Sequence, residues 1–181
     1  IDKILFNTRR LSTLAGNILL LSKLDSQSIR PRRSRFRLDE QVRQCILALE
    51  RRWTEKEVDF DVDLDSVDFT GYEGLLQHVW TNLIDNAVKF GPRGGLVQMR
   101  LVQETGSVLF TIDNEGSVIS EKDKARIFNK FYQGDSSHES EGNGLGLALV
   151  RKIIAIHGGE VWLEDPASGG CRFAVRLPME T

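Results

Sequence analysis

Three polar side chains in the middle of the chain have the types and the spacing of a phosphate or metal site. Asn82, Asn86 and Lys89 stand four and then three residues apart, which places them on one face of a helix. Amide oxygens can coordinate Mg²⁺, and an ammonium group can neutralise phosphate. The same stripe also suits an ordinary solvent-exposed face. The spacing by itself therefore leaves a nucleotide site and a polar surface as equal alternatives.

A glycine-rich stretch, GNGLGL at residues 142–147, is the second candidate site. Closely spaced glycines let the backbone come near phosphate groups, and the helix expected after them offers free N–H groups and the positive end of its dipole. A dinucleotide-binding βαβ unit is disfavoured, because it needs a strand directly before the glycines and the polar loop 134–142 stands there instead. A phosphate-binding loop and a flexible hinge remain as interpretations.

Two further segments lie between these candidates. NEGSVI at 114–119 follows a predicted strand, and IFNKFY at 127–132 follows a predicted short helix. Taken singly, the first is compatible with a plain turn and the second with an aromatic pair in the core. Only the order of all these segments along the chain is informative.

The elements that must position these residues follow from the spacing of apolar side chains. Helical spacing predicts helices at 39–53, 72–90, 121–128 and 145–157. Asp39 is the predicted N-cap of the first helix, and Gly91-Pro92 ends the second. Alternation predicts strands at 36–38, 58–64, 96–102, 108–112, 160–164 and 171–177, with a hairpin formed by 96–112. Because strands and helices do not alternate strictly, we predict an α/β two-layer sandwich with a mixed sheet.

Residues 1–26 are predicted to form one long helix before this domain. Apolar residues recur every seven positions in two rows, Ile4, Leu11 and Ile18 in one and Leu14 and Leu21 in the other. A lone amphipathic helix cannot bury its stripe, so it needs partners. Docking on this chain's own domain is one possibility, but the strict heptad favours a bundle with other helices.

Charge divides the chain near residue 53. Residues 1–53 carry 12 Lys/Arg and 5 Asp/Glu, a balance of +7, whereas residues 54–181 carry 12 and 21, a balance of −9. The arginine-rich run 30–37 could contact nucleic acid or anionic lipid. Aromatic residues do not interleave it before Phe36, which favours a solvated linker and no nucleic-acid partner.

The composition excludes several other classes of protein. Cys45 and Cys171 lack the spacing of a disulfide framework or a zinc ribbon. The longest apolar run, Ile18–Leu21, is far short of the ~18 residues of a membrane span. Because the sequence opens at Ile1 rather than Met, we expect it to belong to a longer chain.

In this order, the segments resemble the ATP-binding domain of bacterial sensor histidine kinases. NLIDNAVKF at 82–90 resembles the N box of that family, NEGSVI its first glycine box, IFNKFYQ its F box and GNGLGLALV its second glycine box. The resemblance covers about residues 36–178. It implies a Bergerat-type fold, with a mixed sheet carrying three helices on one face.

The resemblance also implies a domain organisation. Residues 1–26 resemble the second helix of the family's dimerisation and phosphotransfer hairpin. Residues 27–35 would be a linker, and residues 36–181 would be the ATP-binding catalytic domain.

The family's nucleotide site can be carried over residue by residue. ATP would lie between the N-box helix and the loop 134–142, with Asn86 as ligand of Mg²⁺ and Lys89 on phosphate. Asn114 would read adenine, because its amide can accept from the N6 amine and donate to N1. The full ATP-binding set implied is Asn82, Asn86, Lys89, Phe90, Asn114, Gly116, Ile119, Lys130, Phe131, Gly142, Gly144, Leu145, Gly146 and Leu147.

This sequence departs from the family pattern around that site. Asn114 stands where the family usually has Asp, and Val118 stands where it has a second glycine, which narrows the pocket. Gln133 replaces a common Arg, and the loop 134–142 holds only acidic charges, Asp135, Glu139 and Glu141. Its field opposes a triphosphate, so Lys89, Mg²⁺ and the helix N-terminus must contribute more.

Two departures concern the reaction. Asn82 stands where gyrase-like ATPases have a water-activating Glu, and an amide cannot act as a general base. Hydrolysis is therefore disfavoured against phosphoryl transfer to another protein. His78, His138 and His157 do not lie in the family's acceptor motif, so we expect structural or solvated roles for them and an acceptor on an upstream helix outside this chain.

The resulting hypothesis is Mg-ATP binding and phosphoryl transfer to that upstream histidine, for relay to a response regulator protein. The parent would be a bacterial protein that dimerises through its helical hairpin, with this part on the cytoplasmic side of a membrane anchor. A pseudokinase or regulatory module is the alternative, favoured by the acidic loop and Val118 but opposed by the Asn86–Lys89 stripe and the glycine loop. A serine-kinase anti-sigma factor is a third option, and the preceding heptad helix argues against it.

Overall fold

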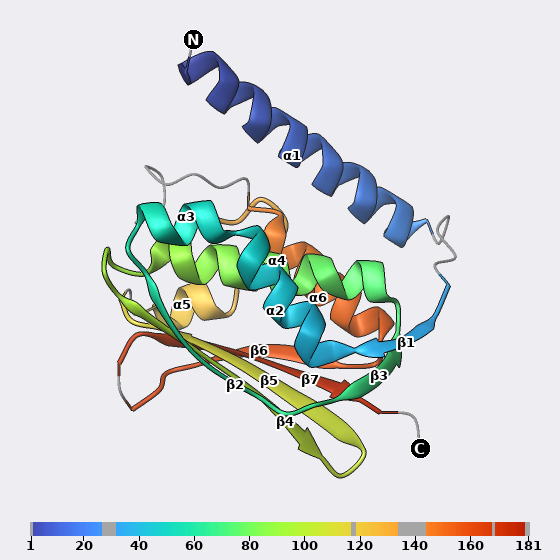
Figure 1. The fold of residues 1–181 in the computed structure, drawn as a ribbon. Helices are drawn as coiled ribbons and strands as arrows, with labels where there is room; N and C mark the ends of the chain where they lie inside the picture. Colours follow the sequence, from blue (N-terminus) through green and yellow to red (C-terminus); the bar gives the residue numbers. More distant parts are fainter. Residues whose placement is uncertain (1, 27–31, 117–118, 134–143, 168, 180–181) are drawn as a thin grey trace.

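A computed structural model of the chain places a layer of helices on one face of a mixed sheet (Figure 1). The structure describes residues 2–26, 32–116, 119–133, 144–167 and 169–179. Its elements, in chain order, are α1 Asp2–Asp25, β1 Ser34–Arg37, α2 Leu38–Ala48, α3 Glu50–Glu55, β2 Asp59–Leu64, β3 Asp68–Gly71, α4 Glu73–Phe90, β4 Leu96–Glu104, β5 Ser107–Asn114, α5 Glu121–Lys124, α6 Gly146–Ile156, β6 Glu160–Glu164 and β7 Cys171–Pro178.

The main sheet has five strands in the order β2-β4-β5-β7-β6. Strand β2 runs parallel to β4, and the other neighbours are antiparallel, so the predicted mixed sheet is confirmed. The predicted hairpin is also confirmed, as β4 and β5. The short strand β3, which pairs with β1 in a separate two-stranded sheet, was not predicted.

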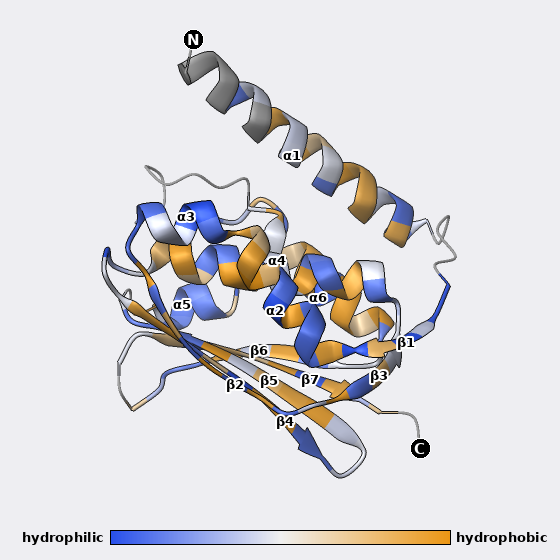
Figure 2. Cartoon of the chain, in the orientation of Figure 1, coloured by the Kyte–Doolittle hydropathy of each residue, from blue (hydrophilic) through white to orange (hydrophobic). Residues whose placement is uncertain are grey.

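The core lies between the two layers, where Figure 2 shows apolar residues gathered on the inner faces of sheet and helices. Side chains of β5 alternate between buried and half-buried, as a strand with one covered face requires. Trp80 of α4 is fully buried, and its ring centroid lies 4.9 Å from that of Phe110 on β5. This aromatic contact joins the helix that carries the predicted Asn stripe to the centre of the sheet.

The helix predicted over 39–53 is two helices, α2 and α3, separated at Leu49. The carbonyl of Ile46 accepts hydrogen bonds from the Leu49 N–H (3.1 Å) and from the Trp53 indole (2.9 Å), which closes α2 with a tight turn. The predicted N-cap was also wrong, because Arg37 is the N-cap and Asp39 lies inside the first turn.

Asp39 is buried because arginines and the backbone satisfy its carboxylate. Arg37 donates to both oxygens (2.9 and 2.8 Å), Arg43 donates at 2.7 Å, and the Val67 N–H donates at 3.3 Å. These contacts, led by Arg37, lower the pKa of Asp39 to about 2. The carboxylate therefore joins the start of α2 to the segment before β3 instead of capping a helix.

The long helix α1 is confirmed, and its apolar stripe divides between two environments. Leu21 and Leu24 are buried in the domain core, and Leu14 packs against it, because the last turns of α1 contact α6. Leu11 and Ile18, from the other heptad row, are exposed. The domain thus covers one row and leaves the second available.

Polar contacts hold the C-terminal end of α1 in the same place. Asp25 pairs with Lys130 at 2.9 Å and with Lys152 of α6 at 2.8 Å, and the two lysines lower the pKa of Asp25 to about 2. The far end of α1 projects away from both layers (Figure 1). Among the described residues, no helix has the length and apolar character needed to span a membrane.

We predict that Asp39→Ala lowers the free energy of unfolding by about 2–3 kcal/mol, because it removes a buried carboxylate that pairs with two half-exposed arginines and leaves the buried Val67 N–H unpaired. The matched control is Asp68→Ala, which removes the exposed Arg35–Asp68 pair (2.9 Å) and should cost under about 1 kcal/mol. Urea denaturation measures both.

The same variant gives a test with pH. Since the folded pKa of Asp39 is lowered to about 2, its contribution is present above the unfolded value, 3.8, and is lost as pH falls toward 2. The difference in stability between wild type and Asp39→Ala should therefore shrink from pH 5 to pH 2. This account would be contradicted if Asp39→Ala and Asp68→Ala lowered the free energy of unfolding equally at neutral pH. It would also be contradicted if the difference in stability between wild type and Asp39→Ala did not change with pH.

Candidate functional site

Helix α4 presents the predicted polar stripe at the edge of its buried face. Asn82, Asn86 and Lys89 are all half-buried, next to the apolar residues that hold the helix in the core. The Asn82 amide donates to the His78 carbonyl one turn earlier at 2.7 Å. In the described part of the chain, the Asn86 side chain has no hydrogen-bond partner. The stripe therefore lies at the margin of the core and not on a freely solvated face.

The C-terminus of α4 is fixed by a lysine that the sequence analysis did not identify. Lys56 Nζ donates to the carbonyls of Val88 (2.7 Å) and Lys89 (2.6 Å). A cation at this position satisfies carbonyls that the helix itself leaves unpaired and opposes the negative end of its dipole. Partial burial lowers the pKa of Lys56. Phe90, the last residue of α4, is exposed, and Lys89 Nζ lies 4.6 Å from the centroid of the Phe90 ring.

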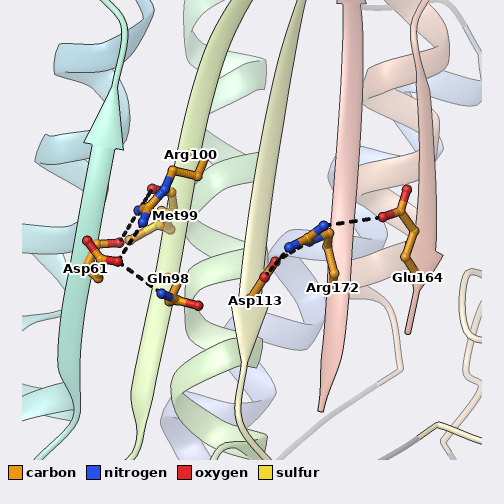
Figure 3. A network of polar contacts seen from close by, with 7 residues as sticks. All are labelled: Asp61, Gln98, Met99, Arg100, Asp113, Glu164 and Arg172. Carbon is orange, nitrogen blue, oxygen red and sulfur yellow. Dashed lines mark hydrogen bonds and ion pairs between the residues drawn. The ribbon is translucent and has the colours of Figure 1, made fainter. Parts of the chain in front are cut away.

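The pleat of β5 places Asn114 and Asp113 on opposite faces of the sheet. Asn114 is 6% exposed on the helical side, where its Nδ2 is 3.5 Å from the Ala87 carbonyl of α4 and its Oδ1 is 2.7 Å from Cys171 Sγ. Asp113 lies on the outer face, where Arg172 donates to both its oxygens at 2.6 Å (Figure 3). The structure thus brings Asn114, and not Asp113, against α4 at Ala87, next to Asn86 in the sequence.

The backbone around Asn114 leaves no room for side chains. Gly170 has φ +79°, and a Cβ on it would lie 2.1 Å from the Asn114 carbonyl oxygen. A Cβ on Gly116 would lie 3.2 Å from the Phe90 carbonyl oxygen. Three chain segments therefore meet closely here: the end of α4, the segment after β5 and the segment before β7.

The glycine-rich segment meets α4 at the first residue of α6. A Cβ on Gly146 would lie 2.5 Å from Asn82 Oδ1, so the start of α6 comes into close contact with the Asn82 side chain. Leu145 is buried and Leu147 is partly buried against the core, which gives both leucines a packing role. Gly142, Val118, His138 and the acidic loop residues Asp135, Glu139 and Glu141 lie outside the described residues.

The F-box segment also joins this corner. The Phe131 N–H donates to the Gly144 carbonyl at 2.9 Å, and Gly144 has φ +66° with its α-carbon against the Phe131 backbone. Phe131 itself has φ 62° and an exposed side chain. Lys130 points to Asp25 of α1 (2.9 Å). Of the predicted site residues in this part of the chain, Ile119 is half-buried against the core.

The short helix predicted over 121–128 covers only Glu121–Lys124. Ser120 caps it by accepting from the Asp123 N–H at 3.2 Å, but the chain then continues in turns. Phe128 is buried edge-on against Phe173 of β7, with ring centroids 6.3 Å apart. The predicted helix therefore ends before Phe128, and the turns that follow α5 carry this ring into the core.

His157 at the end of α6 has a structural place. Its Nδ1 bonds to the Ile153 carbonyl (2.8 Å), and its Nε2 accepts from the Tyr72 N–H (3.1 Å) at the start of α4. Burial lowers the pKa of His157, which keeps the ring neutral. The ring therefore connects the ends of α6 and α4 far from the Asn stripe.

The fold and this arrangement of segments match a known family. Residues 71–181 match the family described as histidine kinase-, DNA gyrase B-, and HSP90-like ATPases. The match covers more than half of the chain, and the chain belongs to this family of ATPases.

Among curated proteins, the chain is 33% identical over 171 residues to the heme sensor protein HssS of Staphylococcus aureus, covering 94% of this chain and 37% of HssS. The chain thus spans little more than a third of the curated relatives that it matches.

Solved structures of histidine kinases share the fold. The mycobacterial sensor histidine kinase MprB is 27% identical with a TM-score of 0.74, over 82% of this chain and 99% of that one. The histidine kinase ThkA, in complex with the response regulator protein TrrA, is 25% identical with a TM-score of 0.78, over 96% of this chain and 49% of that one. The α/β domain is accordingly an ATP-binding catalytic domain of the histidine kinase type.

Proposed function

We propose that this domain binds Mg-ATP between α4 and α6 and transfers the γ-phosphate to a histidine on a helix upstream of this chain. The observation that carries the proposal is the close approach of Gly146, at the start of α6, to Asn82 of the Asn stripe. It supports a site in which the free N–H groups of one helix and the amides of another face the same phosphates.

The base end of the nucleotide would lie at Asn114. This residue is buried between α4 and β7, on the helical side of the sheet. Phe90, which is exposed at the end of α4, would border the nucleotide, and Lys89 would contact phosphate. Lys130, Phe131, Ile119 and the glycines at 116, 142 and 144 would complete the binding set.

The donor set fits Mg²⁺ as part of a nucleotide complex. The described residues hold no cluster of His, Cys, Asp or Glu able to bind a metal ion alone. Mg²⁺ is commonly held by one or two protein oxygens together with substrate phosphates and water. The half-buried Asn86 amide, which has no partner in the described part of the chain, can supply such an oxygen. Bound there, Mg²⁺ would neutralise phosphate charge.

The chain's own residues favour transfer over hydrolysis. Asn82 cannot remove a proton from water, and its amide already donates to the His78 carbonyl. Phosphoryl transfer depends mainly on positioning and charge neutralisation, so a protein acceptor brought to the site can react without a general base on α4.

We propose two kinds of partner for this chain, other helices that pack on α1 and a response regulator protein. The exposed heptad row of Leu11 and Ile18 supports a helical bundle, in which residues 1–26 act as the second helix of a dimerising hairpin. Residues 27–35 would link that helix to the catalytic domain at 36–181. A response regulator protein, the partner of ThkA, would receive the phosphate. The domain would face the cytoplasm in a membrane-anchored parent protein.

We predict that Asn86→Ala weakens Mg-ATP binding by at least about tenfold, because it removes an oxygen that contacts the charged Mg-phosphate group. The fold should persist, since Asn86 makes no hydrogen bond within the described residues. Isothermal titration calorimetry measures the affinity, and Gln77→Ala, an exposed position on the same helix, is the matched control. Unchanged affinity in Asn86→Ala would remove Asn86 from the site.

We predict that Asn114→Leu reduces the preference for ATP over GTP by on the order of 1–3 kcal/mol, the cost of losing a buried polar partner. Asp113→Ala should leave that preference unchanged, because Asp113 lies on the outer face with Arg172. Competition binding with both nucleotides measures the preference. If Asp113→Ala has the effect and Asn114→Leu has none, the assignment of Asn114 is off by one residue.

We predict that this chain alone binds ATP but neither labels itself nor turns ATP over quickly, because the acceptor helix is missing. A longer chain that restores this helix should dimerise and form an acid-labile phosphohistidine. Radiolabelled ATP, given to both chains side by side, tests this. Labelling of the short chain at His78, His138 or His157 would contradict the proposal. A longer chain that binds ATP and never labels would support the pseudokinase alternative.

A further inference from the structure

Helix α4 ends at residues that cannot continue its backbone hydrogen bonds. The Gly91 N–H still donates to the Ala87 carbonyl at 3.0 Å, but Gly91 is extended, with φ −68° and ψ 161°, so the chain leaves the helix there. The Val88 carbonyl would next need the N–H of residue 92, which is a proline and has none. The Lys89 carbonyl would need the N–H of residue 93, which lies beyond the extended residue. The last turn of α4 therefore requires a donor from elsewhere in the chain.

The Lys56 ammonium group supplies that donor. Its Nζ donates to the Val88 carbonyl at 2.7 Å and to the Lys89 carbonyl at 2.6 Å. Lys56 is half-buried at the end of α3, which lies beside this end of α4 (Figure 1). The carbonyl of Lys56 accepts from the Gly94 N–H at 3.0 Å, so the segment that follows α4 holds the Lys56 backbone as well. The lysine is thus fixed at its backbone and at its side chain.

The turn that Lys56 binds carries two of the residues proposed to contact the nucleotide. Lys89 and Phe90 are the last two residues of α4, and Lys89 Nζ lies 4.6 Å from the centroid of the Phe90 ring. Because Lys56 binds the Lys89 carbonyl, it fixes the peptide plane that follows Lys89. Helix ends fray readily, and a frayed turn would let the Lys89 side chain leave the backbone in several directions. Lys56 therefore limits where the Lys89 ammonium group can lie.

Other residues already attach α4 to the domain and end the helix. Trp80 is fully buried in the middle of α4, and Arg52 of α3 pairs with Asp85 one turn before the end. Gly91 and Pro92 stop the helix by themselves. What Lys56 adds is a pair of hydrogen bonds at the final turn itself, where Lys89 begins.

We propose that Lys56 is a positioning residue for nucleotide binding, which holds the end of α4 so that Lys89 can contact phosphate. Lys56 acts through Lys89 and does not itself touch the nucleotide. The proposal rests on the role proposed above for Lys89 in binding Mg-ATP. It gives a function in the nucleotide site to a lysine that stands on another helix, 33 residues before Lys89 in the sequence.

The test measures Mg-ATP affinity by isothermal titration calorimetry. Lys56→Met removes the donors and the charge but keeps most of the side chain, and it should weaken binding by about fivefold, part of the effect of losing one charge-assisted contact. Lys56→Arg retains donors and charge and should stay within about twofold of wild type. The matched control is Arg51→Met, which removes one exposed positive charge from α3 and its pair with Glu55 (2.8 Å). It should leave the affinity unchanged.

A double-mutant cycle separates positioning from a general loss of structure. Lys89→Met alone should weaken Mg-ATP binding by at least about tenfold. In that background Lys56→Met should change the affinity by less than about twofold, because no ammonium group remains to be positioned. A general disturbance of the domain would reduce the affinity equally in both backgrounds. If circular dichroism shows that Lys56→Met does not fold, Lys56→Gln, which retains a neutral donor, replaces it in the cycle.

The outcomes distinguish the role of Lys56 from the function on which it rests. A wild-type chain that binds no Mg-ATP would overturn the proposed function, and wild-type affinity in Lys89→Met would overturn the placement of Lys89. The role of Lys56 would fall with either. If Lys89→Met weakens binding but Lys56→Met does not, or if Lys56→Met acts equally in both backgrounds, the role of Lys56 is overturned and Mg-ATP binding stands.

Discussion

The packing of α4 against the sheet is the constraint on which the rest of the structure depends. Trp80 is fully buried between the helix and Phe110 of β5, and its indole N–H donates to Gln41 of α2 at 2.9 Å. One side chain thus fixes α4 to the sheet and to a neighbouring helix. Because a helix has a rigid periodicity, fixing its apolar face also fixes the edge that carries Asn82 and Asn86. The candidate site is positioned by the core and needs no separate scaffold.

The packing of the helices on one face of the sheet also determines which side chains lie on its outer face. Strands β5 and β7 must bury one face, so the pleat turns Asp113 and Arg172 outward, where they pair with each other. Arg172 also pairs with Glu164 at 3.7 Å. Asp61 and Arg100 form a similar pair on β2 and β4 at 2.6 Å (Figure 3). Such partly exposed pairs stabilise less than fully buried ones, and they let an open sheet face remain solvated. A slip of one residue would exchange Asn114 with Asp113 and place a charged pair in the core.

Sequence reasoning succeeded where a local pattern decides the structure. The helix over 72–90, its end at Gly91 and the hairpin were predictable, because apolar spacing and glycine act over a few residues. It failed where distant contacts decide. The break at Leu49 depends on the Trp53 indole, and Asp39 is buried because Val67 lies beside it. The contact between Cys171 and Asn114 joins residues 57 positions apart, so no local signal identifies it. Lys56, which closes α4 from 32 residues away, is a similar case.

Helix α1 packs on the domain through one heptad row and exposes the other row to a further helix. Leu21 and Leu24 are buried against the domain, so hydrophobic contact supplies most of the docking, and the exposed ion pairs of Asp25 add orientation more than energy. One of those pairs reaches Lys130, next to Phe131, whose backbone bonds to Gly144 just before α6. The end of α1 and the glycine-rich helix start therefore share one corner of the molecule. A helix that packs on the exposed row of Leu11 and Ile18 would lie against a helix already joined to the nucleotide-binding domain. That joint is made by a few side chains at the C-terminal end of α1, in which Leu21 and Leu24 belong to the same buried core as Trp80.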